Sequence, residues 1–124
     1  MIVIDSSALI ALVRQEPGAD RVAAAIDGAF VSAVILADSL SKIADFGYDP
    51  EAVRTGFLAA GINVTAFGPA DVGAVVALHG FSKQRISLAD RFCLALALDR
   101  NLPVLTGDRA WAGLGLPLKI ELIR

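Results

Sequence analysis

The chain has 124 residues and a formal net charge of −2 at pH 7, and 56% of its residues are hydrophobic. This length fits one domain with one core, over residues 1–124, and the acidic balance argues against a protein that simply coats nucleic acid. The lone cysteine excludes an internal disulfide. No apolar run approaches the roughly 18 residues of a membrane helix, and no signal peptide precedes the domain. We therefore expect a cytoplasmic protein without membrane contact, whose apolar excess is partly covered by a partner.

The first element is a short apolar run, residues 2–4, that stops at Asp5. An unbroken β-branched run is typical of a strand that is buried on both faces of a sheet. Ser6 and Ser7 follow, and because hydroxyl residues are good helix caps, they predict a helix that ends near Arg14. Asp5 is therefore expected where a central strand meets a helix, which is the edge where open α/β sheets bind ligands.

Helical and strand patterns then alternate along the chain. We predict helices at 18–26, 33–46, 50–60, 69–79 and 88–99, strands at 29–31, 62–67, 102–106 and 118–123, and a loop at 80–86. The helix at 88–99 is apolar on nearly all sides and is expected near the centre. Strands that alternate with helices predict an α/β domain whose mostly parallel central sheet is covered on both faces.

Each candidate acid has an ordinary structural explanation when it is taken alone. Asp5 and Asp108 follow predicted strands and can cap the helices after them. Asp90 stands three residues after Ser87 in a capping-box pattern. Asp38 can form an ordinary ion pair with the lysine one turn later on its helix. None of the four predicts a function by itself.

Three of the acids together predict a metal site. The carboxyl ends of parallel strands meet at one edge of a sheet, so we expect Asp5 and Asp108 to converge there. Asp90 opens a buried helix, where a charge is costly unless it is paired or metal-bound. Clustered carboxylates repel one another, and Mg²⁺ or Mn²⁺ suits an all-oxygen, water-rich coordination. The sequence offers neither a histidine–cysteine set for zinc nor a glycine-rich phosphate loop.

The acids lie in four short motifs. These are Ile2-Val3-Ile4-Asp5-Ser6-Ser7-Ala8-Leu9, Ser32-Ala33-Val34 leading to Leu36-Ala37-Asp38, Ser87-Leu88-Ala89-Asp90, and Thr106-Gly107-Asp108-Arg109-Ala110-Trp111. In this order and spacing they resemble PIN-domain proteins over essentially the whole chain, and especially the VapC toxins of type II toxin–antitoxin pairs. The resemblance implies a PIN-like three-layer α/β/α domain and an Mg²⁺- or Mn²⁺-dependent endoribonuclease. It also implies homodimers and a cognate antitoxin that blocks the site.

The resemblance also implies roles for individual residues. The positions that match the metal-binding acids of the family are Asp5, Asp90 and Asp108, with Asp38 as a further catalytic acid. The supporting hydroxyl positions are Ser6, Ser7 and Thr106. Basic residues in or beside the acid-bearing segments are candidates for contact with RNA phosphates, and they are Lys42, Lys83, Arg85, Arg91 and Arg109. For any single one of these, a solvated surface charge is the competing explanation.

One position departs from the family pattern. The family normally has a glutamate in the third helix, where this chain has Asp38. The missing methylene shortens the reach by roughly 1.5 Å, and Mg²⁺ demands near-ideal geometry at roughly 2.0–2.1 Å. Asp38 could act through a bridging water, or the site could be weakened or tuned to Mn²⁺. A catalytically weakened module that mainly binds its antitoxin is therefore the alternative to an active ribonuclease.

A third class of function is a phosphoacceptor or nucleophile at Asp5, as in haloacid-dehalogenase-like or receiver domains. The first class needs a second aspartate two residues later, where this chain has Ser7. The second needs a late lysine after a strand, where this chain has Asp108. The sequence therefore argues against both.

Overall fold

A computed structural model describes residues 1–84 and 86–124, without the side chains of residues 82–84. Five strands form one sheet in this part of the chain: β1 (Val3–Ile4), β2 (Phe30–Ser32), β3 (Asn63–Thr65), β4 (Val104–Thr106) and β5 (Ile120–Leu122). Their order is β3-β2-β1-β4-β5, and every neighbouring pair is parallel. The expected parallel sheet is confirmed, and β1 lies at its centre.

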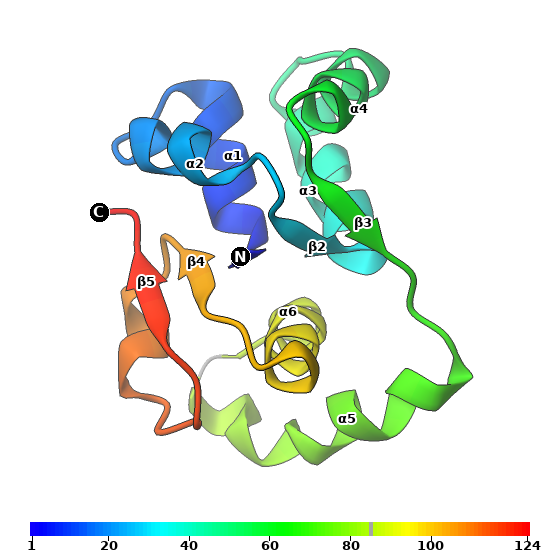
Figure 1. The fold of residues 1–124 in the computed structure, drawn as a ribbon, viewed down its shortest axis with the longest axis vertical. Coiled ribbons are helices and arrows are strands. Elements are labelled where there is room, and N and C mark those ends of the chain that lie inside the picture. Colours follow the sequence, from blue (N-terminus) through cyan, green and yellow to red (C-terminus); the bar gives the residue numbers. More distant parts are fainter. Residues whose placement is uncertain (85) are drawn as a thin grey trace.

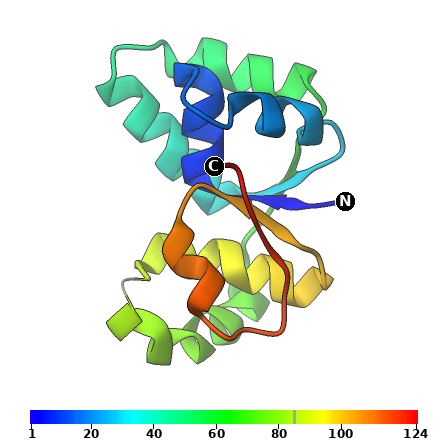
Figure 2. The ribbon, with the colours of Figure 1, turned by 90° about the vertical axis from the view of Figure 1, so that its left-hand side faces the viewer.

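Helices cover both faces of this sheet. The α-helices are α1 (Ser6–Arg14), α2 (Ala19–Ala25), α3 (Ala33–Asp45), α4 (Pro50–Ala59), α5 (Val72–Ala77) and α6 (Leu88–Arg100). The 3-10 helices are η1 (Pro69–Asp71), η2 (His79–Gln84) and η3 (Arg109–Gly113). Figures 1 and 2 show α1 to α4 on one face and α5, α6 and η3 on the other, which makes three α/β/α layers.

Most element boundaries lie within a few residues of the predicted ranges, with one correction. The predicted loop at 80–86 is wrong over much of its length, because η2 continues to Gln84; residue 85 lies outside the described residues. For α1 the sequence offered both the serines and Asp5 as caps. The structure shows Asp5 as the N-cap, and its side chain accepts from the backbone N–H of Ser7.

The core lies on both faces of the sheet: Leu9 of α1 and Ile43 of α3 are buried on one face, and α6 covers the other, where the sequence pattern placed the central helix. Val3, Ile4 and Leu105 of the central strands are fully buried, as are Cys93 and Leu94 of α6. Helix α6 also contacts α3, so the two helices approach each other beside the sheet. No helix within the described residues combines the length and the apolar character that spanning a membrane requires.

Candidate active site

Asp5 is the most firmly held of the four acids. Its backbone N–H extends the ladder between β1 and β4 by donating to the carbonyl of Leu105 at 3.0 Å, and the residue is only 4% exposed. Oδ2 of Asp5 accepts from Oγ of Ser7 at 2.7 Å and from Oγ1 of Thr106 at 2.9 Å. Oδ1 takes part in neither bond. The two hydroxyls therefore hold the carboxylate through Oδ2, and a backbone hydrogen bond from Ser6 also stabilises its charged form.

The two hydroxyls that hold Asp5 are themselves oriented by the turn after β4. The backbone N–H of Gly107 donates to Oγ of Ser7 at 2.8 Å, and that of Asp108 donates to Oγ1 of Thr106 at 3.0 Å. These bonds give both hydroxyl residues a defined role in orienting the carboxylate. Ser6 is different, because its Oγ accepts from Ser39 of α3 at 2.9 Å. Of the three predicted supporting residues, Ser7 and Thr106 reach the carboxylate, and the Ser6 hydroxyl packs against α3.

Asp90 and Asp108 both cap helices, as the structural explanation predicted. Oδ2 of Asp90 accepts from the backbone N–H of Ser87 at 2.9 Å, and Oγ of Ser87 accepts from the N–H of Asp90 at 3.1 Å. Oδ1 of Asp108 accepts from the N–H of Ala110 at 3.0 Å at the start of η3. Each cap uses one carboxylate oxygen. Capping and metal binding are thus compatible at these positions, because the second oxygen takes no part in the cap.

Three of the acids influence one another electrostatically. Burial raises the pKa of Asp5, the hydrogen bonds from Ser7 and Thr106 lower it, and the charge of Asp90 raises it. Burial likewise raises the pKa of Asp90, with further repulsion from Asp108 and an opposing attraction from Lys42. The topology therefore brings Asp5, Asp90 and Asp108 within electrostatic range at one edge of the sheet.

Asp38 is engaged with its own helix. Nζ of Lys42 lies 3.1 Å from Oδ2 of Asp38, one turn along α3. This ion pair lacks hydrogen-bond alignment, so the buried Oδ2 has no hydrogen-bond donor among the described residues. The ordinary i, i+4 pair predicted from the sequence is confirmed. An unbonded buried carboxylate oxygen also leaves a place for a water or a cation.

Three of the predicted basic residues have described side chains. Lys42 pairs with Asp38 and also lowers the pKa of Asp90. Arg91 has a buried Nε without an acceptor among the described residues, and Arg109 is exposed just after Asp108. Lys83 and Arg85 lie outside what is described at side-chain level. Their predicted contact with RNA phosphates stays a prediction.

Two residues near the acids had not been assigned a role from the sequence. Cys93 is fully buried in α6, and burial together with the charges of Asp5 and Asp90 raises the pKa of its thiol well above the usual range. It therefore stays a protonated packing residue beneath the acids. Arg124 lies beside the turn at Gly107. Neither placement has a local sequence signal, because both depend on contacts between distant segments.

The donor chemistry fits a hard divalent cation. Asp5, Asp90 and Asp108 present oxygen atoms, and their shared negative field would be relieved by a cation. Among residues 1–84 and 86–124, however, no three histidine, cysteine, aspartate or glutamate side chains form a group that could already hold a metal ion. The acids lie at one edge of the sheet without forming a ready coordination sphere. Metal binding by these residues stays a prediction.

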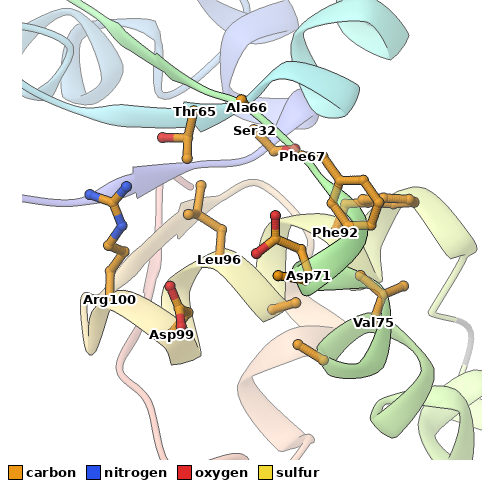
Figure 3. Close-up of a pocket in the computed structure, with 13 residues that line it drawn as sticks. Ser32, Thr65, Ala66, Phe67, Asp71, Val75, Phe92, Leu96, Asp99 and Arg100 are labelled. Carbon is orange, nitrogen blue, oxygen red and sulfur yellow. The ribbon is translucent and has the colours of Figure 1, made fainter.

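A cavity of about 240 Å³ lies apart from the acids, between the β2–β3 side of the sheet, α5 and α6 (Figure 3). Phe67, Phe92 and Leu96 form much of its apolar lining, and Asp71 and Asp99 add charge. None of the four candidate acids lines it. The cavity and the acidic edge are therefore separate features of the molecule.

The chain matches a known protein family. The family model described as "PIN domain" matches residues 2–115. The chain therefore belongs to the PIN domain family, as the four motifs predicted. No protein with a curated description matches the sequence.

Solved structures of toxin–antitoxin systems share this fold. A toxin-antitoxin complex from Klebsiella pneumoniae is 17% identical with a TM-score of 0.78, and the match covers 100% of this chain and 98% of the other. DNA-bound VapBC from Salmonella typhimurium is 16% identical with a TM-score of 0.75 and 100% coverage of both chains. VapBC-1 from nontypeable Haemophilus influenzae is 20% identical with a TM-score of 0.70, covering 99% and 98%. At these identities the likeness concerns the fold.

Proposed function

We propose that this PIN-domain chain is a divalent-metal-dependent endoribonuclease and the toxin of a VapBC-type toxin–antitoxin pair. It would hydrolyse RNA phosphodiester bonds at the edge that carries Asp5, Asp90 and Asp108. The single observation that carries the proposal is the state of Asp5. Its buried carboxylate is clamped through Oδ2 by Ser7 and Thr106, while the charge of Asp90 raises its pKa.

This arrangement is typical of a functional site rather than of a cap alone. A helix cap needs one accepting oxygen and no second carboxylate nearby. Here, burial and a neighbouring acid both oppose ionisation of Asp5, which destabilises the folded state at neutral pH. Perturbed acids of this kind cluster at functional sites. A cation bound by Asp5 and its neighbours would offset the cost of ionising these acids in the folded state.

The residues of the chain would divide the work as follows. Asp5, Asp90 and Asp108 would hold Mg²⁺ or Mn²⁺, and Ser7 and Thr106 would keep the Asp5 carboxylate in one orientation. A cation bound there supplies Lewis acidity and a water of lowered pKa. Asp38 would orient a water through its unbonded Oδ2. Single-stranded or loop RNA is the expected substrate, because unstacked nucleotides enter a cleft most easily.

We also propose that the chain forms a homodimer in the cytoplasm and is held inactive by a cognate antitoxin. Support comes from the fold, which this chain shares over nearly its whole length with chains of toxin–antitoxin complexes. The exposed apolar residues Phe46, Tyr48, Val72, Val76 and Leu88 offer surface for such partners. Operator DNA binding, as in the DNA-bound VapBC complex, would belong to the antitoxin.

The second candidate is a catalytically weakened PIN module that mainly binds its antitoxin. The observation in its favour is the ion pair between Asp38 and Lys42 at 3.1 Å. Asp38 stands where the family has the longer glutamate, and Lys42 competes for its carboxylate. A weak site of this kind would keep the protein interface while losing turnover.

The experiment that tests the proposal is cleavage of a total small-RNA pool by purified, antitoxin-free protein. The protein is incubated with Mg²⁺, Mn²⁺ or EDTA beside the Asp5→Asn variant. Discrete, metal-dependent products that vanish in the variant would support a site-specific endoribonuclease. Absence of products in either metal, from protein shown to be folded, would favour the weakened binding module.

A further inference from the structure

The side chain of Arg124 reaches back to the acidic edge from beyond β5. A β-carbon built on Gly107 would lie 3.2 Å from Nη2 of Arg124 and 3.4 Å from Oγ of Ser7. The guanidinium and the Ser7 hydroxyl therefore both lie next to the Cα of Gly107, where a side chain would otherwise project. Oγ of Ser7 is in turn 2.7 Å from the Asp5 carboxylate. Figure 2 shows the chain end at this residue beside α1 and the turn that follows β4.

One edge of this guanidinium is anchored and the other is not. Nη1 of Arg124 donates to the carbonyl of Pro17 at 3.1 Å and lies 3.8 Å from Oε1 of Glu16. Glu16 also pairs with Arg14 at 3.1 Å, so its charge is shared between two cations. Nη2 takes part in none of these bonds, and the Arg124 side chain is 38% exposed. Arg124 thus presents an oriented N–H edge beside Gly107.

Gly107 makes this approach possible. A β-carbon on this residue would lie closer to the guanidinium of Arg124 than normal van der Waals packing allows. The absence of a side chain therefore leaves room for Arg124. The same residue uses its backbone N–H to orient Ser7. One turn therefore places both a hydroxyl that holds Asp5 and a fixed positive charge at the same edge.

We propose that Arg124 binds a phosphate of the RNA strand next to the Asp5 site and so positions the substrate; this inference rests on the proposed nuclease function. An acidic edge repels the RNA backbone, so a substrate that enters it needs a cation nearby. A guanidinium suits this task because it forms paired hydrogen bonds to phosphate oxygens. Anchoring by Pro17 and Glu16 reduces the side-chain entropy that phosphate binding would otherwise cost.

The test is binding of a fluorescent single-stranded RNA to the full chain in EDTA, measured by anisotropy over a series of salt concentrations. Arg124→Gln should weaken binding about tenfold and flatten the salt dependence by about 0.7 in the log–log slope, as expected for one lost phosphate contact on a single strand. Arg124→Lys should keep the slope and recover part of the affinity. Arg54→Gln is the matched control, because Arg54 is an exposed arginine paired with Glu51 on α4. It should change neither quantity.

A purely structural role for Arg124 predicts a different pattern. If Arg124 only anchored the turn at Glu16 and Pro17, then Glu16→Gln would weaken RNA binding as Arg124→Gln does. If Arg124 binds phosphate, Glu16→Gln leaves most of the binding intact, because the hydrogen bond to the carbonyl of Pro17 still anchors the guanidinium. The inference is overturned if wild-type protein binds RNA and Arg124→Gln binds equally well at every salt concentration. Failure of the wild-type protein both to bind and to cleave any RNA would instead overturn the proposed function.

Discussion

Oγ of Ser7 lies 2.7 Å from Oδ2 of Asp5 and at the same time accepts the backbone N–H of Gly107 at 2.8 Å. This hydroxyl connects the end of β1 to the turn after β4, and through that turn to Arg124. Thr106 makes a parallel connection, since its Oγ1 donates to Asp5 and accepts from Asp108. Two neutral hydroxyls thus hold a buried carboxylate in place without adding charge.

Ser7→Ala should lower the free energy of unfolding by about 1.5–3 kcal/mol, the range for a hydrogen bond to a charged group. It should also reduce RNA cleavage, because Oδ2 of Asp5 loses its shortest bond. Urea denaturation and a cleavage time course measure the two effects. Ser41→Ala is the control, since Oγ of Ser41 donates to the carbonyl of Ala37 within α3, in an exposed place. Equal losses in both variants would show that Ser7 has no special connection to the site.

Stability of the metal-free protein should fall as pH rises. Burial and Asp90 raise the pKa of Asp5, so the folded state binds more protons than the unfolded state between pH of about 3.9, the unperturbed value, and the folded pKa. In this window the free energy of unfolding decreases with pH. Asp5→Asn should remove much of this slope, be more stable than the wild type in EDTA at neutral pH, and lack cleavage. Asp90 contributes a slope of the same sign, because its pKa is also raised, first of all by burial.

Chemical denaturation in EDTA between pH 4 and 8 measures this effect. Added Mg²⁺ or Mn²⁺ should stabilise the wild type more than Asp5→Asn, because a bound cation relieves the repulsion that the variant lacks. If Asp5→Asn is unfolded at room temperature, Asp5 is a structural residue. An unchanged pH slope in the folded variant would show that the titration belongs to another group.

Asp38→Glu should increase both the rate of cleavage and the affinity for Mn²⁺ by about tenfold, the effect typical of a residue that orients metal ligands without binding the metal itself. The added methylene restores the reach of the family glutamate and loosens the ion pair with Lys42 that now holds the carboxylate. Cleavage rates and isothermal titration with Mn²⁺ measure the change. Asp45→Glu makes the same chemical change at the exposed end of α3 and should have no effect. Unchanged cleavage in Asp38→Glu would mean that the shorter side chain does not limit this site.

Gly107→Ala should displace Arg124, because the new methyl group would lie 3.2 Å from Nη2 and 3.3 Å from Cζ. The end of a long side chain moves easily, so we expect the free energy of unfolding to change by less than about 1 kcal/mol. RNA affinity should fall as it does in Arg124→Gln. In the double variant the two losses should not add, because both remove the same contact. Additive losses would show that the methyl group acts through Ser7 instead.

Much of the fold, and the placement of Asp5, Asp90 and Asp108 at element ends, could be predicted from local signals. A β-branched run that ends at Asp5 has few other interpretations, and the Ser87-to-Asp90 spacing predicts the capping box that the structure shows. Strand–helix alternation then requires a parallel sheet whose carboxyl ends share one edge. These inferences succeed because each depends on residues that are close in the sequence.

The details of the site depend on contacts that local patterns do not contain. Asp5 caps α1, and this sets the helix phase so that Ser7 faces the carboxylate and Ser6 faces α3. Two adjacent serines look equivalent in the sequence, and only the packed helix distinguishes them. Arg124 reaches Pro17 across a separation of 107 residues. No periodicity or motif could indicate that meeting.

The bond between Thr106 and Asp5 also has a consequence for the time at which the site can form. Its partners are 101 residues apart, and Asp5 is already synthesised long before Thr106 emerges from the ribosome. Chains are made at about 5–20 residues per second. Several seconds therefore pass between the synthesis of Asp5 and the synthesis of β4 with Thr106. The clamp on Asp5 is therefore complete only after nearly the whole domain has been translated, and a ribonuclease activity of the kind proposed, which depends on that clamp, would begin only then.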